Sequence, residues 1–393
     1  MKISKIQAIP VWYEPTEAYH QLFGSNKSPG SMVHAREAWF AGIKYKENVF
    51  VKLYTDEGIV GWGEATAHPV TSETQQGLVS TIELFGELIT GMDPFSIGAI
   101  HSKLDDFFLH GNSGARSAID IALYDVMGKA SNQPIYKLLG GGFQKSFGLL
   151  GTMPSDTSQA MAEMAAALVK QGYTCFEPKM TGQLESLEED AKRLKAILNV
   201  VPESVLVIAD PNQTWGTPKN TIDLLERHFR DIKNLAVEQP IHFSDLPGLK
   251  LITRAVSQKV VADEVASSIP VTMDIAHERA ADMISLKLGK NGGFYKSIQM
   301  MRIAEAAGLE VRVDWTQGSR LLDTATAHLH ACIRLVGCDP AVDYHLRIKE
   351  DPVVEGGVKL TDNGASVPEG PGLGITIDED LVEYLRNKNS QNT

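Results

Sequence analysis

The sequence predicts an α/β protein, built as a (β/α)8-type, TIM-like barrel with an α+β unit in front of it. From about residue 146 onward, short β-rich runs alternate with amphipathic helical stretches. Eight such runs can be counted, and eight parallel strands are the number that closes this kind of barrel. The first 140 residues differ, because alternating strands come first and helices follow, which is typical of an α+β arrangement.

The N-terminal part predicts a small antiparallel sheet. Residues 2–13 and 49–55 alternate apolar and polar side chains, and a third run, 59–65, follows an Asp-Glu-Gly turn. A long polar segment, 13–46, joins the first two strands, and a connection of that length is usually a functional loop such as a lid, or else disordered. Small and apolar residues at helical spacing over 73–140 predict helices against the sheet.

The barrel prediction depends on runs that are short, apolar and separated by single helices. They are 146–152, 173–179, 205–210, 235–238, 259–263, 283–287, 310–315 and 341–345. An open doubly wound sheet is the structural alternative. No GxGxxG follows any of these runs, so a dinucleotide-binding sheet lacks its signature.

Composition excludes several classes of protein. The chain has 393 residues, 43% hydrophobic and 22% charged, and a net charge of −12, which disfavours nucleic acid and anionic membranes as partners. No apolar run approaches the roughly 20 residues of a spanning helix, and the N-terminus lacks a signal peptide, so we expect a cytoplasmic protein. The cysteines, Cys175, Cys332 and Cys338, are odd in number and outside any CxxC, which predicts small apolar residues.

Charged residues stand at the ends of five successive predicted strands. In chain order they are Lys179, Asp210, Glu238, Asp263 and Lys287. The carboxyl ends of barrel strands form the active site, so these side chains should converge. Three converging carboxylates would repel one another unless a cation were present, and oxygen ligands suit Mg²⁺. A lone acid at a strand end is more often a helix N-cap, but three in a row between lysines are hard to explain by capping.

The two lysines indicate chemistry at a carbon next to a carboxylate. Such a proton is very weakly acidic, since its removal makes a dianionic enediolate, and a divalent ion on the carboxylate stabilises that charge. A lysine near the cation has a lowered pKa and can be a neutral base. The structural alternative is that Lys179 and Lys287 only form ion pairs with the acids.

Several segments resemble the mandelate racemase/muconate lactonizing enzyme family of the enolase superfamily, over nearly the whole chain. They are TDEGIVGWGEA (55–65), ARSAIDIALYDVMGK (115–129), LLGG (138–141), FEPK (176–179), ADPNQTW (209–215), VEQPI (237–241), ADEV (262–265), SLKLGKNGG (285–293) and PEGPGLGI (368–375). Enolase-superfamily sites pair a lysine or histidine base with Mg²⁺.

The resemblance implies a set of roles for named residues. Asp210, Glu238 and Asp263 would bind Mg²⁺, or Mn²⁺ as the alternative, with Lys179 and Lys287 as acid/base groups on opposite faces of the substrate's α-carbon. It also implies a capping domain over 1–140, completed by the tail from about 355–393, and a catalytic barrel over 141–354. The capping-domain loop would bring Tyr19, His20 and Phe23 to a small carboxylate substrate. The family commonly forms homo-oligomers, from dimers to octamers.

The sequence departs from the family's motifs at two positions that bear on the substrate. The run 310–315 contains no histidine, so the chain is similar to the muconate lactonizing branch, which usually carries Lys-x-Lys where this chain has Glu177-Pro178-Lys179. Glu177 could pair with Lys179, raise its pKa, or meet a cationic substrate group, and the bland alternative is an acid paired with a neighbour. Dipeptide epimerases carry Asp-x-Asp where this chain has only Asp343, which disfavours a dipeptide and leaves a simpler amine or a betaine as the alternative. Asn212 and Trp315, beside two strand ends, are further candidate substrate contacts.

Racemisation or epimerisation of an amino-acid derivative is the leading functional hypothesis, because two bases on opposite faces can remove a proton and return it. A β-eliminating lyase, acting on a hydroxy acid or a hydroxylated cyclic amino acid, shares the enediolate, and so does a cycloisomerase. A metal-dependent hydrolase would need histidine ligands, and none precedes His345 at a strand end. A non-catalytic homologue is the remaining alternative, and Glu177 is the feature that favours it.

Overall fold

The N-terminal sheet is antiparallel, with strand order β1 (Ile3–Tyr13), β2 (Lys46–Thr55) and β3 (Val60–Thr66). This computed structural model describes residues 1–24, 44–68, 71, 73–182, 186–315, 317–361 and 364–388. Gly58, with φ at +82°, supplies the left-handed residue of the turn between β2 and β3. The predicted meander is confirmed, although β2 begins at Lys46 instead of residue 49.

Helices cover one face of this sheet. They are α3 (Gln75–Ile89), α4 (Ile97–Phe107), α5 (Ser113–Ser131) and the short α6 (Ile135–Leu138). Helix α5 lies so close to β3 that a Cβ on Gly61 would stand 2.2 Å from the carbonyl oxygen of Ala122, and one on Gly63 would stand 1.9 Å from that of Ala118. The glycines of β3 and the small residues of α5 are therefore matched, because any larger side chain would separate the two elements.

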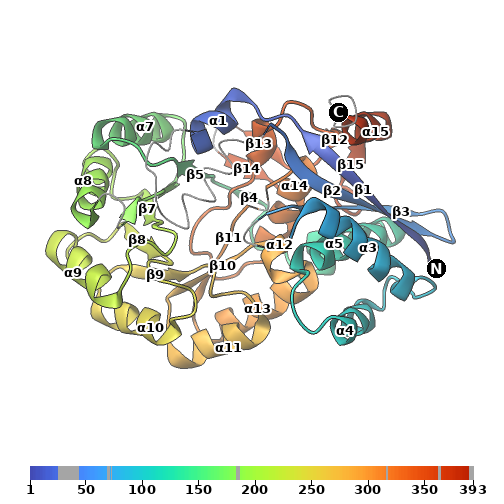
Figure 1. The fold of residues 1–393 in the computed structure, drawn as a ribbon, viewed down its shortest axis with the longest axis horizontal. Coiled ribbons are helices and arrows are strands. Elements are labelled where there is room, and N and C mark those ends of the chain that lie inside the picture. Colours follow the sequence, from blue (N-terminus) through green and yellow to red (C-terminus); the bar gives the residue numbers. More distant parts are fainter. Residues whose placement is uncertain are drawn as a thin grey trace.

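The barrel sheet is parallel throughout and runs in chain order. Its strands are β5 (Leu150–Met153), β6 (Cys175–Pro178), β7 (Leu206–Ala209), β8 (Leu235–Glu238), β9 (Lys259–Ala262), β10 (Met283–Leu286) and β11 (Glu310–Val313). The helices that follow them are α7 (Ser158–Lys170), α8 (Leu187–Leu198), α9 (Pro218–His228), α10 (Leu246–Ala255), α11 (Ile269–Glu278), α12 (Leu288–Asn291), α13 (Phe294–Ala306) and α14 (Arg320–His330). Figure 1 shows α7 to α11 as an arc outside the strands.

The prediction of a strand over 341–345 is wrong. The segment just before it closes the barrel: Val336 bridges to Val311 of β11, and the carbonyl oxygen of Pro340 accepts a hydrogen bond from Leu150 N of β5 (3.2 Å). The chain then turns into a short 3₁₀ helix, η2 (Tyr344–Arg347). Asp323 on α14 holds this turn, since its carboxylate accepts from the backbone nitrogen of His345 (2.8 Å).

The first predicted barrel run, 146–152, is divided between two sheets. β4 (Ser146–Phe147) pairs with β14 (Gly364–Ser366) from the C-terminal tail, and only β5 joins the barrel. The chain leaves one sheet for the other at Gly148, whose nitrogen donates to Asp339 Oδ1 (2.9 Å).

The C-terminal tail contacts both parts of the molecule. Its other elements are β12 (Val353–Gly356), β13 (Lys359–Thr361), β15 (Ile375–Ile377) and α15 (Glu379–Asn387). β13 pairs with β14, β12 pairs with β15, and α15 packs on β1, with Lys52 of β2 paired to Glu379. Figure 1 shows α15 beside β1 and β2, far along the chain from both.

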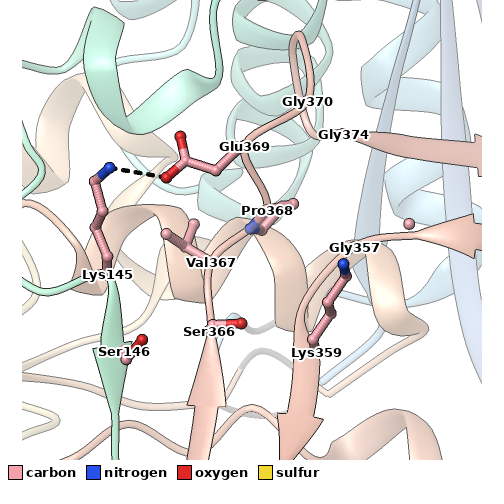
Figure 2. A pocket seen from close by; sticks show the side chains of 11 residues that line it. Lys145, Ser146, Gly357, Lys359, Ser366, Val367, Pro368, Glu369, Gly370 and Gly374 are labelled. Carbon is pink, nitrogen blue, oxygen red and sulfur yellow. Dashed lines mark hydrogen bonds and ion pairs between the residues drawn. The ribbon is translucent and has the colours of Figure 1, made fainter.

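A hollow of about 550 Å³ lies between β4 and the tail. Its lining mixes glycines and Pro368 with small or polar side chains, and Figure 2 shows the pair of Lys145 and Glu369 (2.8 Å) at one side. Lys359 is the remaining charged residue of the lining. This set contains no cluster of acids or bases comparable with the one at the barrel mouth.

Two expectations from composition can be compared with the structure. Cys175, Cys332 and Cys338 are buried and free, as predicted for small apolar residues. Within the described ranges, no helix combines the length and the apolar character needed to cross a bilayer.

Candidate active site

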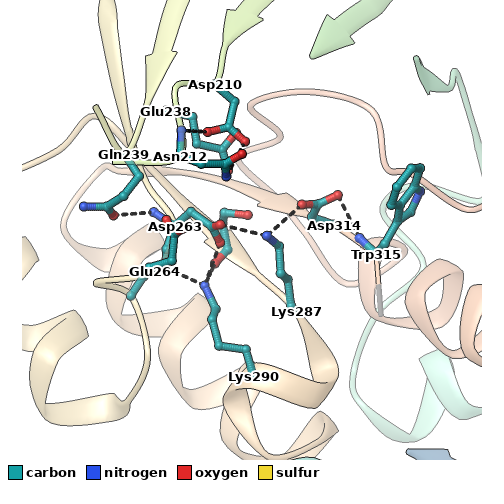
Figure 3. Close-up of polar contacts among 12 residues, drawn as sticks. Asp210, Asn212, Glu238, Gln239, Asp263, Glu264, Lys287, Lys290, Asp314 and Trp315 are labelled. Carbon is teal, nitrogen blue, oxygen red and sulfur yellow. Dashed lines mark hydrogen bonds and ion pairs between the residues drawn. The ribbon is translucent and has the colours of Figure 1, made fainter. Parts of the chain in front are cut away.

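The charged strand-end residues lie at one edge of the barrel sheet. Lys179 directly follows β6, Asp210 follows β7, Glu238 ends β8, Asp263 follows β9 and Lys287 follows β10. The strands are parallel and nearly in register, and Lys179 bridges to Asp210, so successive strand ends meet. The three predicted metal ligands expose 2% or less of their surface. Figure 3 shows Lys287 linked to Asp263, with Asp210 and Glu238 nearby.

A cluster of three carboxylates forms part of this site. Glu177, Asp210 and Glu238 each bring an oxygen within 4.8 Å of the other two. Burial, together with the charges of Glu177 and Asp210, raises the pKa of Glu238 well above its ordinary value, although Arg312 opposes that shift. The Oε1 atom of Glu238 is buried and has no hydrogen-bond partner among the residues that the structure describes. A divalent cation would fit this donor set, because it would satisfy that oxygen and offset the repulsion.

Asp263 is held differently from the other two predicted ligands. Its Oδ2 contacts Lys287 Nζ (2.7 Å), and its Oδ1 contacts Lys290 Nζ (2.9 Å), as Figure 3 shows. Burial alone would raise the pKa of Asp263, but the ammonium groups of Lys287 and Lys290 outweigh it and lower that pKa. The predicted ligands are therefore adjacent, yet Glu177, and not Asp263, completes the cluster of mutually close oxygens.

Left-handed turns aim two of the acids. Asn212 and Gln239 have φ of +43° and +35°, a region that residues other than glycine rarely adopt. Asn212 donates to both oxygens of Asp210, through its backbone nitrogen (2.8 Å) and its Nδ2 (2.9 Å). Gln239 Oε1 accepts from the backbone nitrogen of Asp263 (3.1 Å). Strained backbone beside the acids is typical of a functional site, and it places Asn212 as a support for Asp210.

Each predicted base is surrounded by carboxylates. Lys179 Nζ contacts Asp210 Oδ2 (2.5 Å) and Glu177 Oε1, and Lys287 Nζ contacts Asp263 Oδ2 (2.7 Å) and Asp314 Oδ2 (3.0 Å). Burial disfavours both ammonium groups, but these acids more than compensate, so both lysine pKa values lie well above the ordinary value. Proton transfer at neutral pH therefore requires that part of this negative charge be balanced, which a divalent cation among the acids would do.

Sequence reasoning missed Arg312, which lies in the barrel interior on β11. Its guanidinium is 1% exposed and reaches Glu238 Oε2 (2.5 Å), Glu177 Oε2 (2.6 Å) and Asp314 Oδ2 (3.0 Å). Burial alone would lower its pKa, but these three acids raise it well above the ordinary value. The only sequence signal was a charged pair, Arg312 and Asp314, at period two between valines of a predicted strand.

Three of the predicted substrate contacts, Trp315, Asp343 and Tyr19, lie beside η2. Trp315 is half-buried, its ring 5.4 Å from that of Tyr344, with the guanidinium of Arg347 4.8 Å from its ring centre. Asp343 is buried, and Arg347 balances its charge through an ion pair to Oδ1 (3.1 Å), although that oxygen accepts no hydrogen bond from the described residues. Tyr19 is fully buried, on α1 (Glu17–Gly24), which packs against η2.

His20, another residue of the predicted capping loop, lies on α1 and is exposed, and its ring centre is 5.5 Å from that of Tyr19. The side chain of Phe23 lies outside the described residues.

Comparison with known proteins identifies the family. Residues 160–381 match the family described as enolase C-terminal domain-like, and residues 32–140 match the mandelate racemase/muconate lactonizing enzyme N-terminal domain. The chain belongs to this family. The predicted resemblance and the predicted barrel class are therefore confirmed.

Relatives in the mandelate racemase/muconate lactonizing enzyme family match almost end to end. A hydrophobic dipeptide epimerase from Enterococcus faecalis is 34% identical over 85% of this chain and 93% of its own, and an N-succinyl-L-Arg/Lys racemase from Bacillus cereus is 31% identical over 86% and 90%. A crystal structure of the Enterococcus faecalis dipeptide epimerase with Mg and L-Leu-L-Tyr superposes with a TM-score of 0.83 at 31% identity, covering 96% of this chain and 100% of that one. The relatives also include a dehydratase and cycloisomerases, so this chain stands among isomerases and lyases of the enolase superfamily.

Proposed function

We propose that this protein is a racemase or epimerase that moves the α-proton of a small amino-acid derivative between Lys179 and Lys287. The observation that carries the proposal is the pair of partly buried lysines, at the ends of β6 and β10, on either side of a group of buried acids. Two bases that approach one carbon from opposite sides can remove its proton on one face and return a proton on the other. The epimerases and racemases among the relatives support the same reaction.

We propose Asp210, Glu238 and Asp263 as the ligands of a divalent cation, Mg²⁺ or alternatively Mn²⁺. The bound cation would stabilise the negative charge that develops on the substrate carboxylate when the α-proton leaves. The chain's own residues do the rest. Asn212 orients Asp210, Lys290 orients Asp263, and the two lysines hold and exchange the proton.

Glu177 is close enough to the acid cluster to compete with Asp263 for the role of third ligand. Binding of Mg²⁺ to the D210N, E238Q, D263N and E177Q variants, measured by calorimetry, separates the two possibilities. We expect a large loss of affinity for the first three variants and a small one for E177Q. A large loss for E177Q with little change for D263N would transfer the role of third ligand to Glu177.

Proton exchange tests the reaction itself. Single enantiomers of N-acylated amino acids, dipeptides and betaines are incubated with the enzyme and Mg²⁺ in D₂O and followed by NMR. We expect deuterium at the α-carbon of the recovered substrate and of its epimer, with K179A and K287A each retaining exchange for one enantiomer only. Loss of water to give a keto acid from a hydroxy acid, or a cyclic imine from a hydroxylated cyclic amino acid, would instead establish the lyase, which the dehydratase among the relatives makes the second candidate.

The pairing of Asp343 with Arg347 bears on the substrate class. A carboxylate whose charge is already balanced is a poor site for a substrate ammonium group, so we propose a substrate whose nitrogen is acylated or otherwise uncharged in that place. We also expect a homo-oligomer, between a dimer and an octamer, which sedimentation velocity measures directly.

A further inference from the structure

Charged contacts connect the two lysines across the floor of the site. From Lys179 the contacts lead to Glu177 Oε1, from Glu177 Oε2 to Arg312 Nη2 (2.6 Å), from Arg312 Nη2 to Asp314 Oδ2 (3.0 Å), and from Asp314 Oδ2 to Lys287 Nζ (3.0 Å). We call Glu177, Arg312 and Asp314 the ionic bridge. Figure 3 shows its last link, in which Asp314 reaches Lys287 from the side opposite Asp263.

The ionic bridge is buried along its whole length. Glu177, Arg312 and Asp314 expose 2%, 1% and 6% of their surface. Charges taken out of water at such positions are retained only where geometry is good and other hydrogen bonds are made. The planar fork of arginine meets two carboxylates at fixed angles, whereas the ammonium of a lysine can contact two carboxylates but does not fix the angle between them. Arg312 therefore has a shape requirement as well as a charge requirement.

Each lysine has two carboxylate partners of different kinds. One partner is a proposed cation ligand, Asp210 for Lys179 and Asp263 for Lys287. The other belongs to the ionic bridge, Glu177 or Asp314. A bound cation would offset the negative charge of its ligands and so weaken their attraction for the two lysines. The acids of the ionic bridge would then be the main negative charges that hold the lysines in place.

We infer that Arg312 is a positioning residue for both acid/base lysines, acting through Glu177 on Lys179 and through Asp314 on Lys287. This inference rests on the proposed function, because it concerns the same two bases. It also accounts for the Glu-Pro-Lys sequence at 177–179. A lysine at position 177 would stand beside both Arg312 and Lys179, and the like charges would repel, whereas a glutamate links them.

Enantiomer-resolved exchange tests the ionic bridge. Each enantiomer of a substrate offers its α-proton to one lysine, which K179A and K287A identify. At saturating Mg²⁺, we expect E177Q to slow exchange of the Lys179 enantiomer about 10- to 100-fold more than the other, since small misplacements of a catalytic group cost that much. D314N should show the opposite preference, and R312M should slow both. Equal losses for the two enantiomers in both E177Q and D314N would overturn the inference.

Crystal structures of the metal-loaded variants give a readout that does not depend on turnover. We expect Lys179 Nζ to leave its place in E177Q while Lys287 stays, the reverse in D314N, and both to move in R312M. If both ammonium groups keep their positions in all three variants, the inference is wrong whatever the activities are. Absence of exchange in the wild type with every compound would refute the proposed reaction, and the lysine positions would still decide the ionic bridge.

A buried arginine elsewhere serves as the matched control. Arg116 on α5 is 4% exposed and pairs with Asp105 through its Nη1 (2.5 Å). R116M should reduce stability, as R312M does, without moving either lysine and without an enantiomer preference. R312K should rescue R312M only in part, because an ammonium lacks the planar fork that holds the two acids at fixed angles. Wild-type exchange of both enantiomers by R312K would overturn the bridging role of the guanidinium.

Discussion

Substitution of Glu64 by glutamine should change how stability depends on pH. This carboxylate is fully buried on β3, where it accepts hydrogen bonds from Tyr13 Oη (2.9 Å), Asn48 Nδ2 (2.6 Å) and Ser319 Oγ (2.5 Å). Burial nevertheless raises its pKa from 4.5 to about 7. Between these two values the folded protein holds a proton that the unfolded chain has released, so the free energy of unfolding falls as the pH rises through this window.

The pKa difference at Glu64 corresponds to about 3 kcal/mol of stability lost between pH 4.5 and pH 8. E64Q cannot ionise, so its free energy of unfolding should gain up to about that amount relative to the wild type over the same range. Burial lowers the pKa of Lys46 to about 7, and the charge of Glu64 opposes this shift. In E64Q the pKa of Lys46 should therefore fall further, which also makes the stability of E64Q rise with pH relative to the wild type. The K46M and E64Q/K46M variants isolate this contribution.

Urea unfolding at pH 4.5, 6, 7 and 8 measures the effect of E64Q. E355Q, which alters an exposed glutamate on β12, is the control and should follow the wild type at every pH. A difference between E64Q and wild type that stays constant from pH 4.5 to pH 8 would refute the argument from burial.

Three further outcomes are expected. K287A should lower kcat by about 10²- to 10⁴-fold, the range typical of a positioned acid or base, with Mg²⁺ affinity in calorimetry close to wild type; an unchanged kcat would exclude Lys287 as a base. Removal of divalent ions with EDTA should abolish α-proton exchange in D₂O, with recovery on adding Mg²⁺, and full exchange in EDTA would contradict the metal requirement. G61A should lower the free energy of unfolding in urea by about 1–3 kcal/mol, because the new Cβ would meet Ala122 O at 2.2 Å, and a neutral result would show that α5 can move away from β3.

The strand-end residues could be predicted because their placement follows from a simple rule. A side chain that directly follows a buried strand of a parallel barrel must lie at the carboxyl edge. Locating the ends of the apolar runs was therefore enough to predict the site residues Lys179, Asp210, Glu238, Asp263 and Lys287. The closing strand could not be placed that way. Its pairing is made by Val336 and Pro340, in a stretch interrupted by Gly337, and the register depends on β5, far away along the chain.

The contacts of Arg312 could not be predicted from the sequence for a different reason. Alternation tells which residues of a strand share a face, but both faces of a barrel strand are buried, so the pattern does not say which of them points inward. The contact of Lys290 with Asp263 was equally hidden, because it depends on the one-turn helix α12 after β10. The sequence shows the residue types, but it does not show which side chains contact one another in the folded protein.

The place of α15 on β1 has a consequence for biosynthesis. The helix that covers β1, with Val382 and Leu385 buried, follows every other described helix and strand along the chain. One side of β1 therefore stays partly uncovered during synthesis until all of those elements have been made. Apolar surface that is exposed for so long favours aggregation of the nascent chain.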